Sequence, residues 1–131
     1  ALIVVRSAEI MEVAMEGFFL IFYVEEKQTH HGVLLWEWLL KQAVKLGVRG
    51  GSAFRTIGGF GRHQRVHESS FFELAGDTGI EVEFAVSASE ADKLLVLVRQ
   101  EKIRLTYAQM PARFGVIDPE VSEVDGGTAK A

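Results

Sequence analysis

The feature that constrains the fold most is an unbroken apolar run, FFLIFYV at residues 18–24, which is followed by two glutamates. Aromatic and β-branched residues favour a strand, and the run has the length of one. Successive side chains of a strand point to opposite faces of a sheet, so a run without a polar position predicts that both faces are buried. The rest of the chain can cover one of these faces, and the other needs a second partner.

The segments after this run predict a helix and then another strand. We expect the helix over VLLWEWLLKQAVKL, residues 33–46, where Glu37 and Lys41 have the favourable i,i+4 order. Gly47 follows at the position where a helix commonly ends. A second strand is predicted over residues 52–57, and it leads into a glycine-rich stretch.

The second half of the chain repeats the same order. IEVEFAV, residues 80–86, alternates apolar positions with glutamates, which we interpret as the polar side of a half-buried strand rather than as a catalytic pair. Ser87 and Glu90 form a capping box, which predicts a second helix with an apolar stripe at Ala91, Leu94, Leu95 and Val98. Alternation predicts a last strand over residues 103–107, with weaker order beyond Pro111, and FFEL at residues 71–74 is a candidate short return strand.

This order, β-α-β, a long loop, and β-α-β, is that of a ferredoxin-like α+β domain. The predicted fold is a βαββαβ sandwich in which two helices cover one face of an antiparallel sheet. Its uncovered face predicts self-association, and the alternative is that residues 1–16 cover it. We treat residues 1–16, where AEIMEVAME could form two helical turns, as an N-terminal extension, residues 17–116 as the domain, and residues 117–131 as a flexible acidic tail.

Composition excludes several functions. The chain of 131 residues has no cysteine, which rules out disulfides, thiolate ligands and thiol nucleophiles. A net charge of -4 disfavours general nucleic-acid binding, and the apolar runs are too short to cross a bilayer, so we expect a cytoplasmic protein without membrane insertion. There is no serine elbow, Walker loop or nucleophile with an evident base, which predicts that the protein is not an enzyme.

The local charge is reversed between residues 49 and 67, where four arginines, two histidines and five glycines occur without an acidic residue. Glycine lets the backbone approach a ligand closely, and guanidinium groups match phosphate or carboxylate oxygens. The segment is therefore either an anion-binding loop or a tight turn flanked by solvated arginines. Spacing alone does not decide between these two interpretations.

Within this segment, Gly59-Phe60-Gly61-Arg62 follows the second predicted strand and opens the long loop. This motif, at this position in a split β-α-β order, resembles the PII-like signalling proteins, especially their uncharacterised PII-like branch, and the resemblance covers residues 17–116. It implies a homotrimer whose intersubunit clefts bind adenine nucleotides or related small effectors. It also implies a set of ligand-binding residues: Gly59, Phe60, Gly61 and Arg62 at the cleft wall, His63 as a further contact, and the basic pair Lys102 and Arg113 directed at phosphates.

The resemblance implies a regulator that binds a small anionic effector, with an adenine nucleotide as the expected one, and that signals to a target protein through a mobile loop after residue 61. Two departures limit it. Arg99-Gln100-Glu101 replaces the glycine-aspartate-glycine turn of PII proteins, and the loop between Arg62 and Ile80 is shorter and has no tyrosine. Sensing of ATP and 2-oxoglutarate, and uridylylation, therefore do not carry over.

The four histidines raise the question of a metal. His63 and His67 are four residues apart, but the glycines before them favour a loop, and no zinc-type spacing links them to the pair His30 and His31. We assign no metal site, and keep as the alternative function a trimeric metal-binding protein of the metal-tolerance type that uses His63 and His67. We expect His30 and His31 in the loop before the first helix, where either caps the helix or reaches a neighbouring subunit's ligand.

Overall fold

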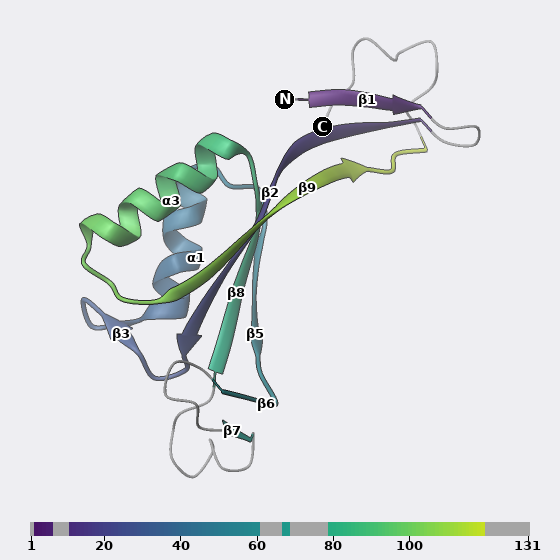
Figure 1. The fold of residues 1–131 in the computed structure, drawn as a ribbon. Coiled ribbons are helices and arrows are strands. Elements are labelled where there is room, and N and C mark those ends of the chain that lie inside the picture. The colour runs from purple at the N-terminus through teal and green to yellow at the C-terminus, as the bar shows by residue number, and fades with distance from the viewer. Residues whose placement is uncertain (1, 7–10, 61–66, 69–78, 120–131) are drawn as a thin grey trace.

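The computed structural model describes residues 2–6, 11–60, 67–68 and 79–119 of the chain. Two helices lie on one side of an antiparallel sheet, and two small hairpins accompany it (Figure 1). In chain order the elements are β1 (Leu2–Arg6), β2 (Met11–Glu25), β3 (Thr29–His30), β4 (Val33–Leu34), α1 (Leu35–Lys45), β5 (Gly51–Arg55), β6 (Gly58–Gly59), β7 (His67–Glu68), β8 (Gly79–Val86), α3 (Ala88–Gln100) and β9 (Thr106–Val116).

β2 is the centre of the sheet because it pairs along both edges. β9 runs beside it from Val13↔Val116 to Tyr23↔Thr106. The opposite edge is shared by β1, which pairs with residues 11–15, and β8, which pairs from Phe18 onward. β5 adds to the far edge of β8, and all of these pairings are antiparallel. Since β2, α1, β5, β8, α3 and β9 follow one another in the order βαββαβ, the predicted ferredoxin-like α+β fold is confirmed.

The core lies between the helices and one face of the sheet. Alternate residues of β2 and β8 point into it, and Leu20, Phe22, Val82 and Phe84 are almost fully buried there. On the helix side of the core, α1 contributes Leu35, Trp38, Leu39 and Ala43, and α3 contributes Ala91, Leu94 and Val98. The alternation predicted for residues 80–86 is therefore confirmed, with the glutamates of β8 on the other face.

The start of α3 and the end of α1 are each determined by local residues that the sequence shows. The hydroxyl of Ser87 accepts a hydrogen bond from the backbone N–H of Glu90 at 3.1 Å, and the Glu90 carboxylate accepts one from the Ser87 N–H at 2.8 Å. This is the predicted capping box. After α1, Gly47 has a φ of +85°, the left-handed conformation that glycine adopts without strain.

Three expectations are corrected. Residues 11–16 are not helical, because β2 begins at Met11 and its first residues pair with β1 and β9. The last strand is β9 and not residues 103–107: Ile103 and Leu105 pack against the core from a loop, which explains their alternation. β9 continues through Pro111 because its outer edge is unpaired in the described sheet, where a missing N–H costs no ladder bond.

The helix-capping role considered for His30 and His31 is also wrong. The N-cap of α1 is Leu34, which makes no side-chain capping bond, and the two histidines belong to the β3–β4 hairpin. The candidate strand at residues 71–74 and the tail beyond residue 119 lie outside the described residues. Neither α1 nor α3, the helices in the described ranges, has the length and hydropathy that a membrane span requires.

The face of the sheet opposite the helices has no cover among the described residues (Figure 1). Register places Phe19, Ile21 and Tyr23 of β2 on this face beside Met110, Ala108 and Thr106 of β9. Phe54 of β5 lies on the same face, since it pairs with Glu81, the partner of Tyr23. β1 extends the sheet within its plane, so residues 2–6 do not provide the cover that we considered for the extension. We call this surface the open face.

Candidate functional site

Hydrogen bonds hold together the two ends of the long loop between β5 and β8. The backbone N–H of Thr56, directly after β5, donates to the carbonyl oxygen of Gly79 at 2.8 Å. The Thr56 hydroxyl donates to the same oxygen at 3.1 Å. Nearby, Arg55 at the end of β5 is hydrogen-bonded to Glu26, which follows β2. The first and last residues of the loop are thus held together at one end of the sheet.

The structure describes only the first part of the glycine-arginine motif. Gly58 and Gly59 form β6, which pairs with His67 and Glu68 of β7. Gly59 and Phe60 are exposed, and Phe60 keeps 70% of its surface accessible. A Cβ added at Gly59 would meet no atom of the described residues within 4 Å, so packing against this part of the chain does not require glycine there. Three predicted residues, Gly61, Arg62 and His63, lie outside the described residues.

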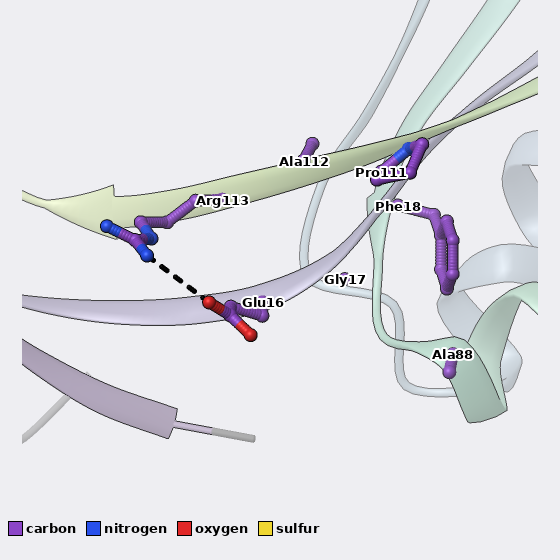
Figure 2. A pocket seen from close by; sticks show the side chains of 7 residues that line it. All are labelled: Glu16, Gly17, Phe18, Ala88, Pro111, Ala112 and Arg113. Atoms are coloured by element: carbon purple, nitrogen blue, oxygen red, sulfur yellow. Dashed lines mark hydrogen bonds and ion pairs between the residues drawn. The ribbon is translucent and has the colours of Figure 1, made fainter.

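Arg113 lies on β9, beside an open depression formed with β2 and the start of α3 (Figure 2). Its guanidinium donates to the carboxylate of Glu16 at 3.2 Å, and both side chains are more than half exposed. Pro111 and Ala112 line the same depression together with Gly17, Phe18 and Ala88. An anion that binds Arg113 would therefore compete with the Glu16 carboxylate.

Lys102 lies elsewhere. It follows the end of α3 with a φ of +56°, and its backbone N–H donates to the carbonyl oxygen of Arg99 at 3.0 Å. Together with Arg99 and Arg104 it lines a second depression whose other lining residues include Asp92 and Tyr107. Three cations and one carboxylate make this depression basic. Arg99 and Arg104 were not among the predicted site residues, although the basic cluster RQEKIR at residues 99–104 was the available signal.

Within one chain, the four predicted ligand-binding residues that the structure describes do not come together. Lys102 and Arg113 line different depressions, and Gly59 and Phe60 line neither. β9 begins at Thr106, so about 23 Å of strand separates its start from Arg113, at ~3.3 Å for each residue. Of the alternative metal ligands, His67 lies on β7 and His63 is not described.

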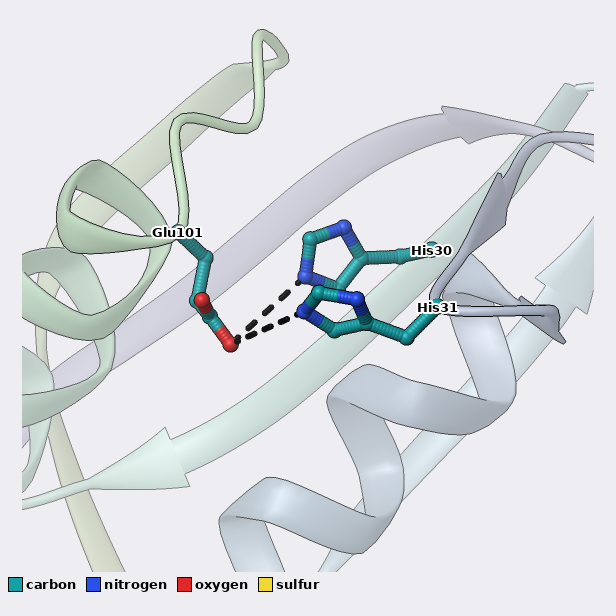
Figure 3. A group of neighbouring side chains, drawn as sticks. All are labelled: His30, His31 and Glu101. Carbon is teal, nitrogen blue, oxygen red and sulfur yellow. Dashed lines mark ion pairs between the residues drawn. The ribbon is translucent and has the colours of Figure 1, made fainter.

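The structure instead gathers another set of polar side chains, which the sequence analysis did not connect. His30 and His31 lie beside Glu101, the C-cap residue directly after α3 (Figure 3). Seventy positions separate the histidine pair from this glutamate in the sequence, so only the tertiary fold shows that they meet.

A model of the DUF190 family, described as "Uncharacterized ACR, COG1993", matches residues 17–104. Similar solved structures include that of a nitrogen regulatory PII-like protein from Thiomonas intermedia K12, bound to ADP, AMP and bicarbonate. It is 18% identical, with a TM-score of 0.56, and the alignment covers 81% of this chain and 92% of that one. A structure of the same protein bound to ADP and bicarbonate is 21% identical, with a TM-score of 0.52 and coverages of 81% and 93%.

A further similar structure is that of a protein from Thermus thermophilus described as PII-like signaling. It is 17% identical, with a TM-score of 0.50 and coverages of 79% and 92%. At these identities the similarity establishes the fold, which is that of the PII-like proteins. The resemblance inferred from GFGR and the order of elements is therefore confirmed.

Proposed function

The chain belongs to the DUF190 family, and on that premise we propose that it is a PII-like regulator that binds a small anionic effector in the clefts of a homotrimer. The proposed effector is an adenine nucleotide. Its binding orders the loop after residue 61, and the ordered loop contacts a target protein. We assign these roles to residues 17–116 and no catalytic role to any residue. Support comes from the fold and from the structural neighbour whose complex contains ADP, AMP and bicarbonate.

The observation that carries the proposal is the open face. Tyr23, Met110 and Phe54 are large apolar or aromatic residues on one side of the sheet, and between 41% and 51% of the surface of each is exposed. The β2 and β9 residues form one apolar patch, from which Glu81 of β8 separates Phe54. Such a patch on a monomer is the kind of surface that proteins bury in an interface. A closed homo-oligomer covers such a face with copies of itself, and it forms clefts where neighbouring sheets meet.

The placement of the basic residues supports an intersubunit cleft rather than a site within one chain. Lys102 and Arg113 are directed to different depressions of the same chain. Both contact one nucleotide only if the two residues come from neighbouring subunits. In this arrangement Arg113 exchanges its Glu16 partner for a phosphate group, two oxygens of which can each accept a hydrogen bond from the guanidinium.

The proposal is tested by isothermal titration calorimetry with ADP, AMP, ATP and bicarbonate. We expect an adenine nucleotide to bind, and Arg62→Ala and Arg113→Ala to weaken binding by about 10- to 100-fold each, which corresponds to a lost charge-assisted hydrogen bond. Glu16→Gln should tighten binding, because it removes the carboxylate that competes for Arg113.

Lys45→Ala is the control, since Lys45 is an exposed cation of α1 that lines neither depression. The proposal fails if none of these nucleotides binds. It also fails if Lys45→Ala weakens binding as much as Arg113→Ala does, because nonspecific charge would then explain the affinity.

A further inference from the structure

The side chains of His30, His31 and Glu101 converge on one point (Figure 3). The Oε1 atom of Glu101 lies 3.6 Å from Nε2 of His30 and 3.6 Å from Nε2 of His31. One ligand atom from each of the three residues lies within 4.8 Å of the other two. We call this group the histidine-glutamate cluster.

The β3–β4 hairpin holds the two imidazoles side by side. His31 and Gly32 form its two-residue turn, with φ values of +51° and +77°, and a turn with two left-handed residues is the type I′ turn that suits a tight hairpin. Successive side chains of a regular strand would point to opposite faces. Here the turn brings the ring centroids of His30 and His31 to 4.1 Å from each other.

Packing against α1 then fixes the imidazole ring of His30. His30 lies edge-on against Trp38 of α1, with 4.7 Å between the ring centroids, and only 15% of its side chain is exposed. Its Nε2 atom is buried and has no hydrogen-bond partner among the described residues, because 3.6 Å to the carboxylate exceeds hydrogen-bond length. Buried polar atoms rarely remain unsatisfied, since their desolvation is costly. This nitrogen therefore points to a ligand.

A cation placed between the three groups satisfies all of them. Ligand atoms at ~2.1 Å from a tetrahedral zinc ion are about 3.4 Å apart, which is close to the two histidine–glutamate separations of 3.6 Å. A simple ion pair explains less, because one imidazolium is sufficient to pair with the carboxylate, whereas both imidazoles are directed at it. Two histidines and one glutamate also form a ligand set that zinc uses in proteins when a fourth position stays open.

We propose that His30, His31 and Glu101 bind a divalent transition-metal ion, with Zn²⁺ as the representative ion. The ion links the β3–β4 hairpin to the end of α3, two segments that otherwise belong to opposite halves of the fold. The site differs from the His63 and His67 pair weighed in the sequence analysis. It does not depend on effector binding, so the two proposals can fail separately.

The test is a Zn²⁺ titration of the full chain, without a polyhistidine tag, by calorimetry and by competition with a chromophoric chelator. We expect one ion for each chain. His31→Asn and Glu101→Gln should each weaken binding at least about 100-fold, since the loss of an outer-shell partner alone typically costs about 10- to 100-fold. Both changes suit the fold, because asparagine favours the left-handed turn and glutamine is isosteric with glutamate.

The matched control is the double variant His63→Ala/His67→Ala, which removes the other two histidines of the chain. It should bind Zn²⁺ as tightly as the unmodified protein. Bound Co²⁺ should in addition give the visible spectrum of a four-coordinate ion, and this spectrum should disappear in Glu101→Gln.

Three results would overturn the proposal: no Zn²⁺ binding by the unmodified protein, unchanged binding in both His31→Asn and Glu101→Gln, or loss of binding in the double variant alone. The last result would instead favour the loop histidines. Melting temperatures measured without metal report whether each variant is folded, and Zn²⁺ should raise the melting temperature only where the cluster is intact.

Discussion

Gly17 is the residue at which the central strand changes its partner. Residues 11–15 of β2 pair with β1, and pairing with β8 begins at Phe18. At this point β8 ends and its chain turns into α3, which brings the backbone of Val86 against Gly17. A Cβ on Gly17 would lie 2.1 Å from the Val86 carbonyl oxygen, far inside contact distance. The close crossing therefore requires glycine.

We predict that Gly17→Ala destabilises the protein by about 1–3 kcal/mol, the usual cost of forcing extra volume into a packed site. Urea denaturation followed by circular dichroism measures the change. Gly50→Ala is the control, because a Cβ at Gly50 meets no atom of the described residues within 4 Å and should leave stability almost unchanged. Equal midpoints for the two variants would show that the crossing of β2 and β8 tolerates a side chain.

Individual residues were predictable from the sequence where their partners are local. Ser87 and Glu90 are three positions apart, and the capping box follows from that spacing alone. The contact of His30 and His31 with Glu101 was not predictable, because it depends on how the β3–β4 hairpin packs against the end of α3. The pairing of Arg113 with Glu16 depends in the same way on strand register.

Among the elements, α3 shows how a helix start is fixed. Its first turn has a satisfied capping box, and Ala91 directly after it is fully buried in the core. The cap therefore sets where β8 ends and at what point the helix begins to cover the sheet. Because the start of α3 also borders the depression next to Arg113, the cap helps to position that surface.

We predict that Ser87→Ala costs about 1 kcal/mol of stability, since it removes the hydroxyl that accepts the Glu90 N–H. Glu90→Gln should cost much less, because glutamine can still accept the N–H of the N-cap residue. Thermal unfolding of both variants under the same conditions gives the comparison. A larger loss for Glu90→Gln than for Ser87→Ala would mean that charge, and not the capping box, stabilises this turn.

The strands show the limits of pattern analysis at this scale. β8 alternates cleanly because one of its faces is buried by the helices, so the sequence predicts it well. β9 was misplaced because it is mostly exposed within one chain and contains Pro111, so neither hydrophobic pattern nor propensity identifies it. Its hydrogen bonds to β2 define it as a strand, and these long-range contacts leave no signal in the sequence.

For the whole molecule, the order of elements was sufficient to predict the fold, because two β-α-β units with two helices admit few arrangements. The unbroken apolar run at residues 18–24 also predicted that both faces of this strand are buried. One of its faces lies in the core, and its other face lies on the open face with Met110 and Phe54. The sequence thus indicated a missing partner, which the proposed trimer supplies.

The most direct test of this account is the mass of the protein in solution, measured by light scattering after gel filtration. We predict about three times the chain mass of 14.5 kDa for the unmodified protein and for Val44→Glu, which adds a charge on the exposed side of α1. Met110→Glu, which adds the same charge on the open face, should give a folded protein of about one chain mass. A monomeric unmodified protein, or a Met110→Glu variant that stays trimeric, would contradict the account.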